Sequence, residues 1–352
     1  MKLSSLLLWG AFAAALTCVA QVPATAAEPY VIYLSNNFMG NDWRQQMIRS
    51  AEVSMKKGPL VGKVDLHIEQ AEGTVQAQID SLNNIIRQKP SAILIDASSQ
   101  TALNPTVRRA CDAGILVISY DQTLTEPCAY ALSVNWDFIP RVMAEWVAQR
   151  LGGKGNVIID RGLPGYEASI ATTKATEETL AKFPDIKIVG YFDGNFAPGP
   201  EQSGVAALLA ANPKIDAVVN MAYGTGAMQA LKDAGRPLVP VTAFSFNGSA
   251  VTCGQTEGAS CILASNPPYL SAEAIKLAVQ ILDTGNRPKD RAIFVKNDFF
   301  STDPLPSKFY PDVTIQKIEL GKNAFPDLSP GLFLPASPDW LDITPAEAVG
   351  KS

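Results

Sequence analysis

Short runs of aliphatic and β-branched residues alternate with longer amphipathic segments along most of the chain. The first apolar run, at residues 30–34, precedes a segment in which Trp43, Met47 and Ile48 recur at helical spacing. The same reading predicts further strands at 64–68, 92–95, 116–119, 156–159, 187–192, 217–220, 239–246 and 293–298, and further helices at 75–86, 103–113, 139–151, 168–182, 201–211, 226–234 and 269–283. Strands separated by such helices indicate right-handed βαβ crossovers and parallel sheets.

The alternation lapses once, between Gln122 and Ser133, and we interpret this lapse as a crossing between two lobes. The predicted fold class is therefore α/β, with two doubly wound parallel-sheet lobes. The helix at 269–283 and the strand at 293–298 are spare elements that could return to the earlier lobe. We assign residues 27–130 and 266–294 to an N-terminal lobe. Residues 131–265 and 295–352 form a C-terminal lobe with an irregular, proline-dotted tail after Asp303.

The first 26 residues have the layout of a secretory signal peptide. Lys2 precedes an apolar run at residues 6–16, and the small residues of Ala24-Thr25-Ala26 follow. The run is too short to span a bilayer, and no later stretch approaches about 20 uninterrupted apolar residues. We expect a mature chain in the periplasm without membrane insertion. Cys18 leaves a lipoprotein open as an alternative, although Ala15 and Thr17 depart from that motif.

Charge and cysteine content narrow the possible partners. The formal net charge of −5 and the lack of a cluster of basic residues argue against nucleic acid and anionic lipid. Four cysteines remain beyond the leader, an even number in a chain that is expected to enter an oxidising space. The pairing that closes the shortest loops joins Cys111 to Cys128 and Cys253 to Cys261, while free buried thiols stay an alternative.

Catalytic and cofactor motifs are weak. His67 is the only histidine, so neither a Ser-His-Asp triad nor a histidine pair for zinc can be built. Gly224-Thr225-Gly226 lies between a predicted strand and a predicted helix, but Gln229 stands where a dinucleotide motif has its third glycine. We expect no cofactor and no metal, and interpret the two glycines as a tight turn.

Polar residues recur just past the predicted ends of parallel strands, the edge at which open α/β sheets bind ligands. These residues are Asp96, Asp121, Arg161, Asn220 and Asn247. Trp43 and Phe196, with Tyr120 and Trp136 as further candidates, would add flat apolar surfaces. Carboxylates and amides bind hydroxyl groups and aromatic rings cover C–H faces, so the pattern favours a sugar or polyol. Asp96 and Asp121 also leave an exported hydrolase open.

Five segments resemble type I periplasmic binding proteins of the ribose-binding family. They are residues 40–44 (GNDWR), 78–86, 92–96, 114–121 and 226–235. The resemblance covers about residues 30–295 and implies two Rossmann-like lobes joined by a three-strand hinge, with the ligand between them. It also implies the substrate-binding component of an ABC sugar transporter, which acts on a membrane permease and is not an enzyme.

The resemblance further implies roles for individual residues. Asn41 and Trp43 fall where the family has an asparagine and a stacking aromatic, and Arg44 replaces a second aromatic. Asp96, Asp121, Phe196, Asn220 and Asn247 fall at or near ligand-binding positions. Ser169 stands where the family commonly has an arginine, for which Arg161 or Arg44 could compensate, and Gln122 replaces another arginine. We therefore expect a ligand other than ribose.

The expected function is that of a periplasmic, monomeric solute-binding protein of an ABC importer. Its lobes would close on a small sugar-like or polyol solute. An extracytoplasmic sensor that presents its closed form to a membrane receptor or kinase remains the alternative, because the sequence does not separate the two. A modified pentose and an amine-bearing solute also fit the polar residues.

Overall fold

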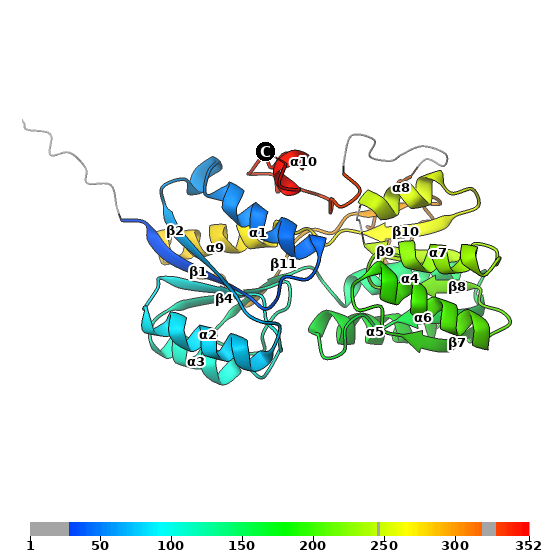
Figure 1. Cartoon of the computed structure of the whole chain (residues 1–352), viewed down its shortest axis with the longest axis horizontal. Coiled ribbons are helices and arrows are strands. Elements are labelled where there is room, and N and C mark those ends of the chain that lie inside the picture. The colour runs from blue at the N-terminus through cyan, green and yellow to red at the C-terminus, as the bar shows by residue number, and fades with distance from the viewer. Residues whose placement is uncertain (1–27, 245–246, 319–328, 352) are drawn as a thin grey trace, which may run out of the picture.

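The computed structural model describes residues 28–244, 247–318 and 329–351 and places them in two α/β lobes that lie side by side (Figure 1). The predicted signal peptide at residues 1–26 lies outside the described residues. Within the described residues, no helix is long and apolar enough to cross a membrane.

The first lobe is built on a six-stranded parallel sheet. Its strands run in the order β11 (Ala292–Phe294), β5 (Tyr130–Ser133), β4 (Leu116–Tyr120), β3 (Ala92–Ile95), β1 (Tyr30–Asn36) and β2 (Val64–Gln70). Helices α1 (Asp42–Ser54) and α9 (Leu270–Thr284) cover one face, α2 (Val75–Arg87) and α3 (Asn104–Asp112) cover the other, and a short turn, η1 (Gly58–Leu60), follows α1. β3 is buried on both faces, so its sequence Ala-Ile-Leu-Ile is wholly apolar.

The second lobe has a seven-stranded sheet. Its order is β13 (Ile315–Lys317), β12 (Phe299–Ser301), β10 (Ser260–Ala264), β9 (Pro240–Phe244), β8 (Ala217–Val219), β6 (Lys154–Asp160) and β7 (Asp185–Phe192). All neighbouring pairs are parallel except β10 with β12. Its helices are α4 (Phe138–Arg150), α5 (Glu167–Leu180), α6 (Pro198–Ala211), α7 (Thr225–Asp233) and α8 (Asn247–Gln255).

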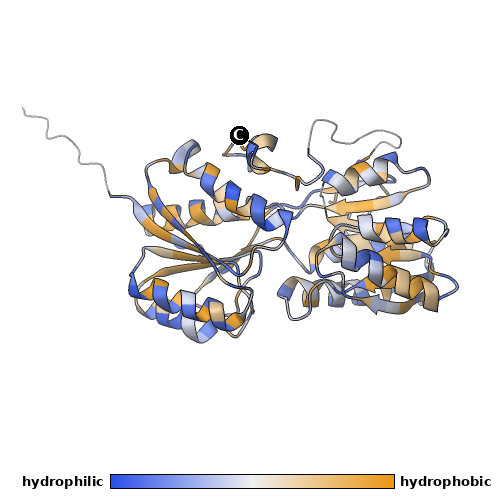
Figure 2. Cartoon of the chain, in the orientation of Figure 1, coloured by the Kyte–Doolittle hydropathy of each residue, from blue (hydrophilic) through white to orange (hydrophobic). Residues whose placement is uncertain are grey.

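Alternating side chains of β6 separate the two cores of this lobe. Val157 and Ile159 pack with α4 and α5, whereas Ile158 packs with α6 and α7. This is the period of two that a strand between two helical layers requires. Figure 2 shows apolar residues concentrated in the strands between the helices.

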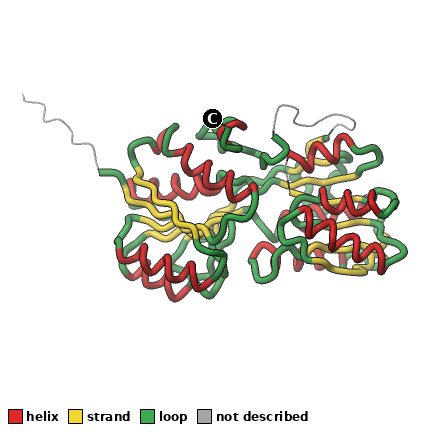
Figure 3. Tube along the Cα trace, viewed as in Figure 1, coloured by secondary structure: helices red, strands yellow, loops and turns green. Residues whose placement is uncertain are grey.

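Within the described residues that precede the tail, three passages of the chain connect the lobes, from β5 to α4, from β10 to α9 and from β11 to β12 (Figure 3). Val295 on the last passage contacts the cores of both lobes. The predicted fold class and the three-strand hinge are confirmed.

The tail divides between the lobes. Asp303 accepts a hydrogen bond at its backbone oxygen from the indole of Trp146 in the second lobe, with N and O 2.8 Å apart. Residues 329–351, which include α10 (Pro345–Ala348), instead pack on α1 and α9 of the first lobe, where Val53 and Ala272 contact Leu332, Leu341, Ile343 and Ala348. This placement differs from the expected assignment of the whole tail to the second lobe, because its apolar side chains find their partners on those two helices.

Both predicted disulfides are present. Cys111 of α3 is joined to Cys128, 17 residues further on, and Cys253 of α8 is joined to Cys261 of β10, 8 residues further on. Each bond ties a helix to a strand or loop of the same lobe. The alternative of free thiols is wrong.

Candidate functional site

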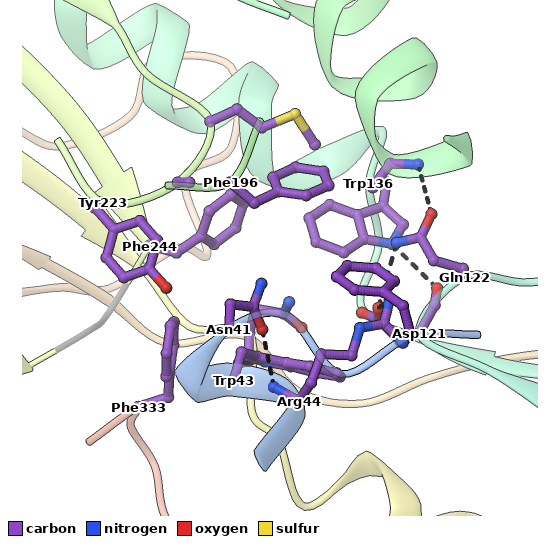
Figure 4. A pocket seen from close by; sticks show the side chains of 15 residues that line it. Asn41, Trp43, Arg44, Asp121, Gln122, Trp136, Phe196, Tyr223, Phe244 and Phe333 are labelled. Carbon is purple, nitrogen blue, oxygen red and sulfur yellow. Dashed lines mark hydrogen bonds and ion pairs between the residues drawn. The ribbon is translucent and has the colours of Figure 1, made fainter. Parts of the chain in front are cut away.

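A cleft lies between the lobes, at the carboxyl ends of both parallel sheets. It encloses about 580 Å³, part of it open to solvent. The cleft is lined by Phe38, Asn41, Trp43, Arg44, Asp121 and Gln122 of the first lobe, Trp136, Ala168, Phe196, Met221, Ala222, Tyr223 and Phe244 of the second, Asn266 of the hinge and Phe333 of the tail (Figure 4). Loops that follow parallel strands supply most of these side chains, as the fold predicts.

The loop between β1 and α1 is fixed by a helix cap. Asn41 Oδ1 accepts a hydrogen bond from the backbone N–H of Arg44, with the atoms 3.0 Å apart, so Asn41 caps α1. This cap places Trp43 and Arg44 in the first turn of the helix. The indole N–H of Trp43 donates to the backbone oxygen of Asn266, 2.9 Å away. This bond ties the first wall, which is the side of the cleft that the first lobe forms, to the hinge.

Arg44 is a buried cation between two acids. Its guanidinium forms an ion pair with Asp96, donates to Asn36 Oδ1 at 2.8 Å, and lies 3.9 Å from Asp121 Oδ2. The ring of Phe38 covers it, with the guanidinium carbon 4.7 Å from the ring centre. Burial lowers the pKa of Arg44, while the charge of Asp121 opposes this change. Asp96 thus holds Arg44 from behind the cleft.

Asp121 stands directly after β4 with a positive φ of 56°, which turns its side chain out of the strand's alternation. Its backbone oxygen accepts hydrogen bonds from Ser133 Oγ at 2.8 Å and from the Trp136 indole at 3.4 Å. Gln122 Nε2 donates to Asp121 Oδ2 at 3.3 Å. Burial raises the pKa of Asp121 and the guanidinium of Arg44 opposes the rise. A carboxylate in this position is well placed to accept hydrogen bonds from a ligand.

The side of the cleft that the second lobe forms, the second wall, is lined mainly by aromatic and aliphatic side chains. The rings of Trp136 and Phe244 meet edge to face, with centres 5.5 Å apart and planes at 75°. Gly162, after β6, lets this wall close up, because a Cβ there would lie 2.6 Å from Met221 Sδ and 2.9 Å from Phe196 Cε1. Its φ of +67° also favours glycine.

Buried carboxylates position the second wall from behind. Glu201 Oε1 accepts a hydrogen bond from the backbone N–H of Tyr223 at 2.7 Å, and burial together with the nearby charge of Asp160 raises the pKa of Glu201 to about 8. Asp160 accepts from the backbone N–H groups of Gly162, Gly194 and Met221, at 2.8, 2.7 and 3.3 Å. Burial raises the pKa of Asp160. Two loops that line the cleft are thus bound to acids beneath them.

The two glycines that follow β8 allow a tight turn between this strand and α7. Gly224 has a φ of +71°, and a Cβ on Gly226 would lie only 2.2 Å from the backbone oxygen of Pro198. The close approach of α7 to α6 therefore accounts for the Gly-Thr-Gly sequence, in agreement with the prediction of a tight turn.

Direct contacts join the two lobes at the rim. The backbone N–H and the hydroxyl of Thr123 both donate to Glu167 Oε2, at 2.8 and 2.5 Å. Asn37 Nδ2 donates to the hydroxyl of Tyr166 at 3.3 Å. These bonds belong to a closed arrangement, because they need both lobes in contact.

The structure brings together five of the ten predicted ligand-binding residues on the cleft lining, namely Asn41, Trp43, Arg44, Asp121 and Phe196. Asp96 lies behind the first wall against Arg44. Asn220 lies behind the second wall and accepts from the backbone N–H of Ala222 at 2.7 Å. Direct ligand contact by any of these residues stays a prediction.

Three predicted residues lie away from the cleft lining. Arg161 is half exposed and forms an ion pair with Asp193, with nitrogen and oxygen 2.9 Å apart, because its side chain turns outward after β6. Ser169 Oγ accepts from the backbone N–H of Leu163 at 3.0 Å. Asn247 is buried and binds the tail through the backbone oxygen of Leu332, at 2.7 Å.

Sequence reasoning missed several lining residues. Tyr223 follows a predicted strand, so the strand-end rule could have included it, whereas Phe244 is the last residue of β9 but lies inside the longer predicted strand at 239–246. Phe333 had no such signal, because the tail shows no regular period. Trp136 lines the cleft as suggested, whereas Tyr120 packs in the core of the first lobe with its hydroxyl 3.3 Å from Met47 Sδ.

The arrangement supports binding more readily than catalysis. His67 stacks on Tyr33 with ring centres 4.7 Å apart and lies outside the cleft. The described residues contain no group of three or more acids, histidines or cysteines that could hold a metal ion. Asp96 and Asp121 share the charge of Arg44 and do not flank an open space, as the two carboxyl groups of a glycosidase do.

Comparison with known proteins identifies the family. A model described as "Periplasmic binding protein domain" matches residues 32–287. A xylitol-binding protein of Mycolicibacterium smegmatis is 29% identical over 272 residues, which cover 75% of this chain and 74% of that protein. The crystal structure of an ABC transporter solute-binding protein from Thermobispora bispora is 29% identical, with a TM-score of 0.69 and 80% and 87% of the two chains covered.

A solute-binding protein of Actinobacillus succinogenes with bound D-allose has the same fold, with a TM-score of 0.69 at 23% identity over 77% of this chain and 96% of that chain. The predicted family is thereby confirmed, and so is the prediction that the protein is not an enzyme. The chain belongs to the periplasmic binding protein domain family and is a substrate-binding protein.

Proposed function

We propose that the protein binds one small sugar or polyol in the cleft and delivers it to the permease of an ABC importer. The observation that carries the proposal is the pairing of Asp121, Arg44 and Asn41 on one wall with the rings of Trp136 and Phe196 on the other. Hydroxyl groups need acceptors and donors, and the C–H faces of a sugar pack on aromatic rings. Xylitol, which one relative binds, and D-allose, which is bound in a protein of the same fold, have this chemistry.

The mechanism we propose is closure of the lobes around the ligand. A ligand that contacts both walls stabilises the closed form relative to the open one by its difference in affinity for the two. The bonds from Thr123 to Glu167 would form in the same step. One chain supplies both walls, which supports a monomer, and residues 1–26 support export to the periplasm, where a permease meets its binding protein.

The test is a ligand screen on the chain secreted through its own leader. Thermal unfolding would be followed with pentoses, hexoses, deoxysugars, pentitols and small amines at equal concentration, because a ligand of the native state raises the melting temperature. We expect a small group of related sugars or polyols to raise it, with calorimetry then giving the affinity. A panel in which amines raise the melting temperature and no sugar or polyol does so would contradict the sugar proposal.

A sensor is the second candidate, favoured by the shared fold of a fructose-binding periplasmic domain from a hybrid two-component system, with a TM-score of 0.67 at 22% identity. Deletion of the gene separates the two functions. Loss of uptake of the labelled ligand supports transport, whereas normal uptake with loss of the transcriptional response to the ligand supports sensing.

A further inference from the structure

The tail forms a strap across the cleft. The family match ends at residue 287, whereas residues 329–333 lie between the two lobes and carry Phe333 into the cleft lining (Figure 4). Phe333 is bound by Gln46, which precedes it by 287 residues, so the two residues meet only in the folded protein. The strap is therefore an addition to the matched part of the fold that reaches the ligand site.

The first lobe holds the strap by a paired hydrogen bond. Gln46 Nε2 donates to the backbone oxygen of Phe333 at 3.0 Å, and the backbone N–H of Phe333 donates to Gln46 Oε1 at 2.9 Å. The Gln46 side chain is almost fully buried, so loss of these partners would leave its amide unsatisfied. Further along, the indole of Trp340 donates to Glu273 Oε1 at 2.6 Å, which anchors the tail on α9.

The second lobe holds the same strap from the other side. The backbone N–H of Asn247 donates to the backbone oxygen of Leu332 at 2.7 Å, and the N–H of Gly248 donates to Pro330 at 2.8 Å. Asn247 Nδ2 donates to the backbone oxygen of Ser329 at 3.0 Å. The start of α8 thus contacts the strap while Gln46 of α1 holds the next residue, so the strap bridges both lobes.

Phe333 closes one end of the cleft. Its ring meets Tyr223 edge to face, with centres 5.9 Å apart and planes at 67°. Figure 4 shows Phe333 and Tyr223 at one end of the pocket, with Asp121 and Gln122 at the other. A ligand that binds Asp121 therefore extends toward the ring of Phe333, which limits its length.

We propose that Phe333 is a specificity-determining residue that contacts the ligand and restricts the cleft to solutes of monosaccharide size. This inference rests on the proposed function of sugar or polyol binding. The ring packs against the ligand carbon atoms remote from Asp121, and the strap blocks longer ligands such as disaccharides. Removal of the ring should weaken binding of the small ligand and admit larger ones at the same time.

The experiment compares Phe333→Ala with Phe333→Leu and with a matched control, Phe309→Ala. Phe309 belongs to the same tail but is exposed on the second lobe, outside the cleft lining. Calorimetry would give the affinity of each variant for the small ligand found in the screen and for disaccharides that contain it. We expect roughly a 10-fold loss for Phe333→Ala, typical of an interface aromatic, a smaller loss for Phe333→Leu, and new disaccharide binding for Phe333→Ala.

The outcomes separate the strap from the proposed function. Unchanged affinity and an unchanged order of ligands in Phe333→Ala, with normal binding by the wild type, would overturn the role of Phe333 alone. A wild type that binds no sugar or polyol would overturn the proposed function itself. Gln46→Leu keeps the ring of Phe333 but removes the hydrogen bonds that anchor it, so we expect this variant to lose ligand affinity as well. Unfolding of the variant without ligand reports any general loss of stability.

Discussion

The two walls of the cleft differ in chemistry. The first lobe supplies the charged pair and the amides, from Arg44, Asp121, Asn41 and Gln122, beside the rings of Phe38 and Trp43. The second lobe supplies Trp136, Phe196, Met221, Tyr223 and Phe244, mostly apolar surface. Hydrogen bonds depend on direction and apolar contact depends mainly on area, so the first wall should choose among ligands while the second adds affinity on closure.

The acids behind the walls differ as well. In the first lobe Asp96 and Asp121 share the guanidinium of Arg44. In the second lobe backbone N–H groups hold Asp160 and Glu201, and burial raises the pKa of both carboxyl groups. Burial raises the pKa of Asp121 as well, but there the guanidinium of Arg44 opposes the rise, whereas backbone N–H groups oppose it for Asp160 and Glu201. The two lobes therefore differ in what keeps their buried acids ionised, a cation in the first lobe and backbone N–H groups in the second.

The largest effect on binding should come from Asp121→Ala on the polar wall. The change removes a buried acceptor and leaves the ligand hydroxyl groups without this partner, while Arg44 keeps Asp96 and Asn36, so we expect a loss of about 2 kcal/mol or more, roughly 30-fold in affinity. Calorimetry with the ligand measures it, and Asp193→Ala, a partly exposed acid outside the cleft lining, is the control. Equal affinity in both variants would remove Asp121 from the site.

A comparable effect, on stability, should come from Glu201 behind the apolar wall. Its pKa is raised to about 8 in the folded protein, from the 4.5 that is usual for a glutamate exposed to water. Between these pH values the folded state therefore binds more protons than the unfolded state. The contribution of Glu201 to stability is complete below about pH 4.5 and is lost as the pH rises through 8. Between pH 6 and 9 we expect the wild type to lose about 2 kcal/mol from this group.

Thermal and urea unfolding at these two pH values would measure the loss, and Glu201→Gln should reduce it. The glutamine keeps an oxygen for the backbone N–H of Tyr223 but does not titrate. A pH profile of Glu201→Gln that matches the wild type would show that Glu201 does not titrate in this range, and would weaken the contrast between the two lobes.

A smaller effect should come from Phe196→Leu on the apolar wall. Leucine keeps much of the apolar volume and loses the flat ring, so we expect a loss of about 1 kcal/mol in ligand affinity. Ligands that share a C–H face but differ in their hydroxyl groups should lose affinity equally. Calorimetry with two such ligands tests this, and a change in their order would give the second wall a part in recognition.

The sequence predicted the fold class, and five of the ten residues predicted to bind the ligand lie on the cleft lining, for physical reasons that can be named. Periods of 2 and 3.6 follow from burial of β- and α-structure, so most strands and helices were predictable. The strands β5, β10, β12 and β13 and helix α8 were not predicted. The strand-end rule placed Asp121 at the right edge of the sheet. It says nothing of where a side chain points, and Arg161 turns outward to Asp193.

The strap was out of reach for a different reason. Gln46 holds the strap at Phe333 and α8 holds it at Leu332, and these two elements lie in separate lobes, so the position of the strap depends on the finished tertiary structure. No local pattern encodes such contacts. Asn247 shows the same limit, since its place after β9 suggested a ligand contact and its hydrogen bonds instead go to the tail.

The smallest effect should come from Arg161→Ala, which tests whether the second wall is free of charge. The Arg161 side chain is half exposed, bound to Asp193 and outside the cleft lining, and an exposed ion pair of this kind contributes about 0–1 kcal/mol to stability. We expect its ligand affinity, measured by calorimetry, to stay within about twofold of the wild type. A loss of about tenfold would mean that the guanidinium leaves Asp193 and reaches the bound ligand. The second wall would then carry a cation opposite Asp121, and recognition would be divided between the lobes.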